Sequence, residues 1–126
     1  MNENKLREQM CLLASSIFDR GLTHGSTGNI SVRLDDDNIL VTPSGSSFGR
    51  LDPNQIVKVT KSGEIIGFTT PTKELPLHQA FYETRGIKSG AVVHLHSTYS
   101  VALSMIPGIN EDNVLPSYTP YSVMLL

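Results

Sequence analysis

The chain has 126 residues, with ten basic and twelve acidic side chains and a formal net charge of −2. This balance gives no electrostatic basis for binding nucleic acid or an anionic membrane, and no apolar run approaches the ~20 residues that span a bilayer. With 39% hydrophobic and 17% charged residues, the composition is typical of one folded globular domain rather than of a disordered segment.

The first predicted element is an amphipathic helix over residues 6–18, because apolar residues recur there at spacings of three and four. Gly21 follows as a natural C-terminal cap. Cys11 is the single cysteine, so no internal disulfide can form, and its place beside the apolar stripe favours a buried, inert thiol over a metal or catalytic role. The lone cysteine and a polar N-terminus without a signal-peptide pattern indicate a cytoplasmic protein.

Two antiparallel hairpins are predicted next, because short runs of alternating or apolar residues are separated by turn residues. Their four strands are expected at residues 30–34, 39–42, 56–59 and 64–66. The aspartate run at 35–37 is interpreted as a solvated turn, since a calcium loop needs a longer pattern of ligands.

A second helix is predicted over residues 74–85, with Thr72 as its N-cap and Gly86 at its end. A strand carrying the apolar residues 91–93 follows, and a third helix is ended by Pro107.

This order of elements predicts the fold class α/β or α+β, a layered domain with a mostly antiparallel central sheet covered by helices. We expect a single domain over residues 1–126, because no linker, repeat or low-complexity segment interrupts the chain.

His94 and His96 stand two residues apart at the end of the last predicted strand. In an extended chain, alternate side chains share one face, roughly 6.5–7 Å apart. Two imidazoles at this spacing can chelate one transition metal, although ordinary surface or core histidines are the alternative. Val93 and Leu95 then face the opposite side and can pack there.

Three loops rich in small residues lie between the elements, at residues 25–29, 43–47 and 70–73. Such loops expose the backbone N–H groups and hydroxyls that a phosphate needs, but plain turns prefer the same residues. The third loop is the best phosphate candidate, because Lys73 in the first turn of a helix is unfavourable unless an anion compensates it.

Glu74 follows Lys73 directly. Alone, it is a first-turn glutamate whose negative charge interacts favourably with the helix dipole. Beside a metal, it can serve as ligand and as general acid/base. One turn later, His78 is expected to have a structural hydrogen-bonding role, and His24 is expected to be exposed in its loop. The sequence contains no P-loop or dinucleotide-binding motif.

Four motifs together resemble those of the class II aldolase/adducin family, in the family's order and spacing. They are Gly21-Leu22 through Gly28-Asn29-Ile30-Ser31-Val32-Arg33, Leu40-Val41-Thr42-Pro43-Ser44-Gly45, Pro71-Thr72-Lys73-Glu74 with His78, and Val92-Val93-His94-Leu95-His96-Ser97. Lys73 stands where the aldolases carry a second serine, which makes this form most similar to the group of 3-oxo-tetronate 4-phosphate decarboxylases.

The resemblance implies one zinc ion per subunit, bound by His94, His96 and, without substrate, Glu74. Glu74 would also be the catalytic acid/base, and Tyr121 is similar to a family tyrosine that assists protonation. The residues implied to bind the substrate phosphate are Gly28, Asn29, Ser44, Gly45, Thr72 and Lys73. The assembly implied by the family is a homotetramer.

The implied function is that of a zinc-dependent lyase acting on a small sugar phosphate through an enediolate. The favoured reaction is decarboxylation of a 3-oxo-tetronate 4-phosphate to dihydroxyacetone phosphate, with fuculose-phosphate-type aldol cleavage or epimerisation as alternatives. The family's zinc site uses a third histidine, and neither His24 nor His78 matches its position. The apolar residues 121–126 are expected to end an amino-terminal portion of the family domain. An inactive truncated product or an adducin-like non-catalytic module is therefore a further alternative.

Overall fold

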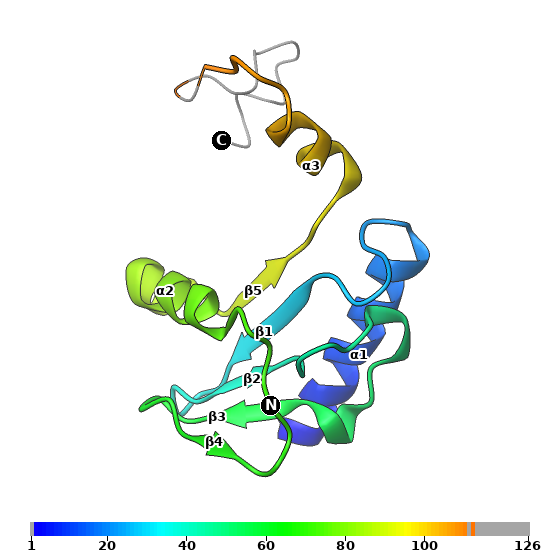
Figure 1. The fold of residues 1–126 in the computed structure, drawn as a ribbon. Coiled ribbons are helices and arrows are strands. Elements are labelled where there is room, and N and C mark those ends of the chain that lie inside the picture. The colour runs from blue at the N-terminus through cyan, green and yellow to red at the C-terminus, as the bar shows by residue number, and fades with distance from the viewer. Residues whose placement is uncertain (1, 111, 113–126) are drawn as a thin grey trace.

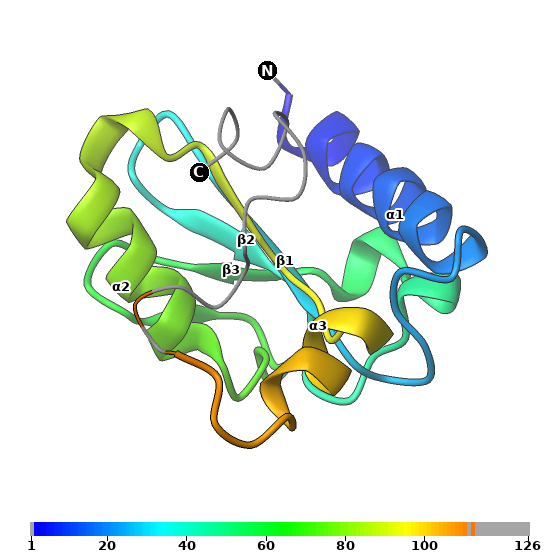
Figure 2. The ribbon, with the colours of Figure 1, turned by 90° about the horizontal axis from the view of Figure 1, so that it is seen from above.

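The computed structural model describes residues 2–110 and 112, and there a five-stranded sheet lies between two helices (Figure 1). Helices α1 (Glu3–Asp19) and α2 (Leu75–Arg85) cover opposite faces of the sheet (Figure 2), and the shorter α3 (Thr98–Ser104) follows the last strand. The strands are β1 (Asn29–Arg33), β2 (Ile39–Val41), β3 (Val57–Val59), β4 (Ile65–Ile66) and β5 (Ala91–His94). The predicted layered domain, with an antiparallel sheet covered by helices, is thereby confirmed.

The strand order is β4-β3-β2-β1-β5, and every neighbouring pair is antiparallel. Both predicted hairpins are confirmed, with Val32 opposite Leu40 in the first and Lys58 opposite Ile66 in the second. Strand β5 pairs with the far side of β1 and places His94 directly opposite Asn29. Two segments more than sixty residues apart in the sequence therefore meet at one end of the sheet.

Each face of the sheet has its own apolar cluster, because successive side chains of a strand point to opposite faces. In β2, Leu40 belongs to the cluster under α1, whereas Ile39 and Val41 belong to the cluster under α2. The α1-face cluster contains Met10, Ala14, Ile30, Leu40, Phe48 and Ile56, and the α2-face cluster contains Ile39, Val41, Val57, Val59, Tyr82 and Val92. Full burial of each large apolar side chain contributes about 1.5–3 kcal/mol to folding.

Helix α2 begins later than the sequence indicates, and Thr72 is not its N-cap. Glu74 occupies the cap position, and the Thr72 hydroxyl instead accepts the Glu74 backbone N–H at 3.3 Å. The backbone N–H of Leu75 also bonds to the Thr72 carbonyl, so the chain makes one turn before the helix starts. Lys73 therefore precedes α2 instead of standing in its first turn, and the dipole argument for an anion beside it no longer applies.

Val93 can pack on the side opposite the two histidines, but in the described part of the chain it does not, because it is 52% exposed. Val93 belongs to β5, which forms one edge of the sheet in the described part of the chain. Leu95, which follows the strand, packs against the α1-face cluster as expected. Among residues 2–110 and 112, no helix has the length and apolar character that crossing a membrane requires.

A small ion-pair network fastens the start of α1 to β3. The Glu3 carboxylate lies 2.8 Å from Lys58 Nζ and 2.9 Å from an Arg7 guanidinium nitrogen. The hydrogen bond from Lys58 is the largest cause of a lowered Glu3 pKa, partial burial opposes it, and the bond from Arg7 lowers it further. Glu3 is therefore held in its charged form where it joins the helix to the sheet.

Glu3→Gln is expected to lower the free energy of unfolding by up to about 1 kcal/mol near neutral pH, the upper range for partly exposed ion pairs. Because the folded-state pKa lies below the ordinary value of 4.5, the loss should be complete above that value and should vanish as the pH falls through the folded pKa. Urea unfolding over this pH range measures it, with Glu8→Gln on the exposed side of α1 as control. A loss independent of pH would contradict the role of the Glu3 charge.

Candidate metal and phosphate site

Three elements bring their ends together around Glu74. Glu74 immediately precedes α2, Asn29 is the first residue of β1, and His94 is the last residue of β5. One ligand atom each of Glu74, His94 and His96 lies within 4.8 Å of the others. The structure thus gathers the three predicted metal-ligating side chains into one cluster.

The side chains of His94 and His96 point to the same side of the chain, although β5 ends at His94. The two imidazole centroids are 5.0 Å apart, and His94 Nδ1 lies 2.6 Å from a Glu74 carboxylate oxygen. Two imidazole nitrogens and one carboxylate oxygen form a donor set that suits zinc and related transition metals. A catalytic zinc has three protein ligands and one open position, and the residues present fit that requirement.

The charge state of Glu74 also suits a ligand. The hydrogen bond donated by the Asn29 side-chain amide is the largest cause of a lowered Glu74 pKa. Burial raises this pKa, whereas the hydrogen bond to His94 lowers it again. Glu74 is therefore an ionised carboxylate at neutral pH.

A cavity of about 310 Å³ opens beside this cluster, and Glu74 and His96 form part of its wall. The rest of its wall includes all six residues predicted to bind phosphate, namely Gly28, Asn29, Ser44, Gly45, Thr72 and Lys73. Ser44, Gly45 and Lys73 are exposed, so their polar groups are accessible from solvent. The three small-residue loops therefore meet at a single pocket next to the candidate metal ligands.

Backbone hydrogen bonds hold two of these loops together. The Ser44 N–H bonds to the Thr70 carbonyl, and the Thr72 N–H bonds to the Thr42 carbonyl, both at 3.0 Å. The adjacent residues Pro43 and Pro71 form an isolated antiparallel bridge. The relative position of the second and third loops is thus fixed by the main chain.

The first loop approaches β5 closely at Gly28, which requires a glycine. Its φ is +82°, a left-handed conformation that L side chains rarely adopt. A Cβ atom there would lie 3.1 Å from both the His94 carbonyl oxygen and Thr23 Oγ1. The absence of a side chain at Gly28 therefore allows the pocket wall to lie against the histidine-bearing strand.

Behind Glu74 lies a set of buried polar residues that the sequence reveals only in part. His78 is fully buried and contacts Ser31 Oγ at 2.7 Å and Asn29 Oδ1 at 2.5 Å, which confirms its predicted hydrogen-bonding role. Ser31 also meets the hydroxyl of Tyr82 at 2.7 Å. Ser31 and Tyr82 were not predicted as members of this set, although the i, i+4 spacing of His78 and Tyr82 places both on one face of α2.

The other singled-out residues lie apart from the cluster or beyond the described chain. His24 is exposed in its loop, as predicted. Cys11 is only half-buried, against the α1-face cluster, and burial raises the pKa of its thiol, so the group stays protonated. Tyr121 falls outside the described residues.

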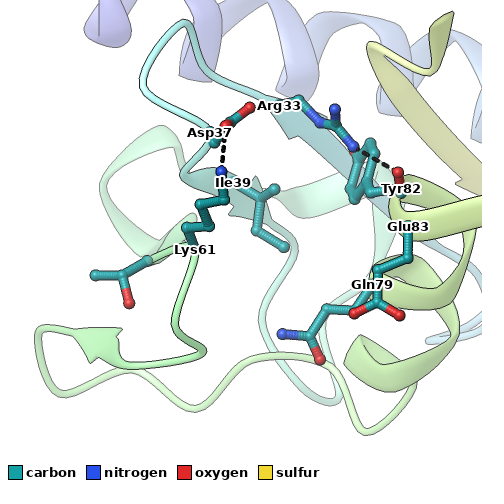
Figure 3. A pocket seen from close by; sticks show the side chains of 8 residues that line it. Arg33, Asp37, Ile39, Lys61, Gln79, Tyr82 and Glu83 are labelled. Carbon is teal, nitrogen blue, oxygen red and sulfur yellow. Dashed lines mark hydrogen bonds and ion pairs between the residues drawn. The ribbon is translucent and has the colours of Figure 1, made fainter. Parts of the chain in front are cut away.

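A second cavity of about 300 Å³ lies between the β-sheet and α2 and is lined by charged residues (Figure 3). Lys61 bonds to Asp37 across 2.7 Å, and the Arg33 guanidinium lies over the Tyr82 ring, 4.7 Å from its centroid. Arg33 also donates to the Tyr82 carbonyl at 2.9 Å. The cations of this cavity thus have partners within it, and none of its lining residues is a member of the Glu74 cluster.

The fold, the cluster of Glu74, His94 and His96, and the cavity between the three loops together define a layered domain. It has a candidate metal centre beside a pocket suited to an anion. The chain belongs to the class II aldolase and adducin family, since residues 8–126 match the family model described as the Class II Aldolase and Adducin N-terminal domain.

Named relatives narrow the comparison further. Over 122 residues the chain is 48% identical to the 3-oxo-tetronate 4-phosphate decarboxylase of Escherichia coli K12, covering 97% of this chain and 57% of that protein. It is 36% identical over 104 residues to the L-fuculose phosphate aldolase of Methanococcus maripaludis, covering 82% and 53% respectively. The crystal structure of YgbL from Escherichia coli superposes with a TM-score of 0.88 at 46% identity, covering 97% of this chain and 58% of YgbL. The chain therefore spans little more than half the length of these proteins.

Gly28→Ala is expected to destabilise the protein more than Gly25→Ala. Both glycines have positive φ, so each substitution should cost about 1–3 kcal/mol of backbone strain, but only at Gly28 does the new Cβ meet neighbouring atoms. Urea unfolding of the two variants measures the difference. Equal losses would contradict the close packing of this loop against β5.

Proposed function

We propose that this chain forms the metal- and phosphate-binding part of a zinc-dependent lyase acting on a small sugar phosphate. The observation that carries the proposal is that Glu74 and His96, two members of the cluster with His94, form part of the wall of the pocket between the three small-residue loops. The 48% identity to a 3-oxo-tetronate 4-phosphate decarboxylase supports decarboxylation of that substrate to dihydroxyacetone phosphate.

The pocket supplies the groups that the substrate phosphate needs. Lys73 provides a cation, and Ser44 and Thr72 provide hydroxyls. Gly28 offers its backbone N–H, and Gly45, where a Cβ would meet no atom within 4 Å, leaves room for the phosphate to approach the main chain. Asn29 completes the set of six proposed phosphate-binding residues. A phosphate held here would fix the distance between the substrate's reacting carbons and the metal ligands.

His94, His96 and Glu74 are the residues that would hold the zinc ion. When bound, zinc supplies Lewis-acid stabilisation of the negative charge that develops on the substrate oxygens. Glu74 has two proposed tasks, as a ligand before substrate arrives and as the acid/base afterwards.

In the proposed reaction, the bond between the carboxylate carbon and the adjacent hydroxyl-bearing carbon breaks. Its electron pair moves toward the neighbouring ketone, so that CO₂ and an enediolate are formed. Protonation of the hydroxyl-bearing carbon then gives dihydroxyacetone phosphate. Because the pKa of Glu74 is lowered, its carboxylate is ionised before the reaction. In the proposed protonation step it takes up a proton from solvent and transfers it to this carbon. Tyr121 is proposed to assist this protonation.

Aldol cleavage is the second candidate function, since it leaves an enediolate in the same way after a different carbon–carbon bond breaks. The 36% identity to an L-fuculose phosphate aldolase supports it, but less strongly than the 48% identity to the decarboxylase supports decarboxylation. Lys73 in place of the aldolases' serine also favours the decarboxylase. Epimerisation and a homotetrameric assembly are suggested by the family resemblance alone. A cytoplasmic location is suggested by the composition alone.

Zinc binding tests the metal part of the proposal. His94→Ala should abolish zinc binding at micromolar protein concentration, because one of three ligands is lost. Titration of the metal-free chain with zinc, followed by calorimetry, measures the effect, and His24→Ala is the matched control because His24 is exposed and outside the cluster. Retention of one zinc per chain in His94→Ala would refute the assignment.

Product formation tests the reaction. The zinc-loaded chain should convert 3-oxo-tetronate 4-phosphate to dihydroxyacetone phosphate, and Glu74→Gln should lower kcat by about 10²–10⁴-fold, the usual contribution of an acid/base group. Glu83→Gln, which alters the cavity of Figure 3, should leave kcat unchanged. Cleavage of fuculose phosphate without decarboxylation would favour the aldolase, and zinc binding without either reaction would indicate a non-catalytic module.

A further inference from the structure

A continuous row of hydrogen bonds leads from the metal cluster into the interior between β1 and α2. The Asn29 amide nitrogen lies 2.5 Å from Glu74 Oε2, and the Asn29 amide oxygen lies 2.5 Å from His78 Nε2. His78 Nδ1 then meets Ser31 Oγ, which in turn meets the Tyr82 hydroxyl, both at 2.7 Å. The four residues behind Glu74 are at most 6% exposed.

The Glu74 carboxylate determines the direction of every bond in this row. An ionised carboxylate can only accept, so the Asn29 amide must direct its NH₂ group toward Glu74 and its oxygen toward His78. His78 Nε2 must then carry a hydrogen. A neutral imidazole has only one N–H, so His78 Nδ1 accepts from the Ser31 hydroxyl. Ser31 Oγ finally accepts from the hydroxyl of Tyr82.

His78 has the neutral charge state that this arrangement needs. Burial is the largest cause of its lowered pKa, the charge of His94 acts in the same direction, and Glu74 opposes them. The far end of the row is also fixed, because Arg33 covers the Tyr82 ring and donates to the Tyr82 carbonyl (Figure 3). The row is therefore anchored at both ends.

We propose that His78 is a positioning residue of the candidate metal site, acting through Asn29. Its Nε2–H tautomer holds the Asn29 amide in the one orientation that donates to Glu74, and this bond directs the Glu74 carboxylate toward His94. The inference rests on the proposed function only in taking Glu74 as a metal ligand, because the hydrogen bonds themselves involve no metal.

The row orients Glu74 and does not deliver protons to it. Asn29 stands between His78 and Glu74, and a side-chain amide does not release one proton while taking up another under ordinary conditions. The consequence of losing His78 is therefore an Asn29 amide held by Glu74 alone, and a less firmly oriented carboxylate. Groups that orient a metal ligand in this way typically contribute 10–100-fold to metal affinity.

Nitrogen NMR of the metal-free, ¹⁵N-labelled full chain tests the arrangement without any enzyme assay. His78 should be neutral with its hydrogen on Nε2, and the Asn29 side-chain N–H signals should shift in Glu74→Gln. In the wild-type chain, the hydrogen bond to Glu74 should move the Asn29 side-chain N–H signals downfield. His78→Leu should remove this downfield shift. His78→Gln should retain it, since a glutamine amide nitrogen can donate from nearly the same position. A hydrogen on Nδ1 of His78, or unchanged Asn29 signals in His78→Leu, would overturn the proposal.

Zinc affinity supplies the second measurement. His78→Leu should weaken zinc binding about 10–100-fold, and His78→Gln should recover most of the loss. Met10→Ala is the control for lost stability, because Met10 is 2% exposed in the α1-face cluster on the opposite side of the sheet. This variant should melt at a lower temperature and yet keep the wild-type zinc affinity.

Two outcomes separate this proposal from the proposed function. If the wild-type chain binds no zinc but has the expected His78 tautomer and Asn29 signals, the metal site is refuted and the positioning of Glu74 by His78 stands. If zinc binds and His78→Leu binds it equally well, the role of His78 is refuted alone. Should His78→Leu not fold, His78→Phe replaces it: a ring without the Nε2 donor should change the Asn29 signals, and unchanged signals would contradict the proposal.

Discussion

The hydrogen-bonded junction of Glu74 with Asn29 and His94 is the interaction on which the site depends. It joins the start of α2 to the start of β1 and the end of β5, three segments that the sequence keeps far apart. A partly exposed carboxylate that faces two histidines would be mobile without a further partner, because its side-chain entropy opposes a single orientation. Asn29 supplies that partner from a nearly fully buried position.

The sheet provides the constraint that makes this junction possible. Pairing of β5 with β1 sets His94 opposite Asn29, and Gly28 lets the preceding loop lie against the His94 carbonyl. Two helices on opposite faces bury both sides of the central strands, so apolar contacts hold the strand ends in place. The polar row through Ser31 and His78 lies on the α2 side of this framework, and each side chain of the row has a hydrogen-bond partner.

Local features of the structure could be predicted from the sequence, and non-local ones could not. Alternation at 30–34 and 39–42 predicted the first hairpin, and the spacing of His94 and His96 predicted that their side chains would face a common side. The pairing of β1 with β5 carries no local signal, because no short turn joins the strands. For the same reason, the tie between Asn29 and Glu74 and the exposure of Val93 on an edge strand appear only once the fold is known. The start of α2 was misplaced because Thr72 is a good N-cap residue by preference, yet its hydroxyl is used in the turn before the helix.

The central claim is that Glu74, His94 and His96 bind one zinc ion together. Anomalous diffraction at the zinc absorption edge, from crystals of the chain grown with zinc, tests it most directly. We predict one zinc peak within about 2.0–2.2 Å of a nitrogen of each histidine and of a Glu74 carboxylate oxygen. A zinc peak held by other residues, or zinc bound to the histidines with Glu74 turned away toward solvent, would contradict the claim.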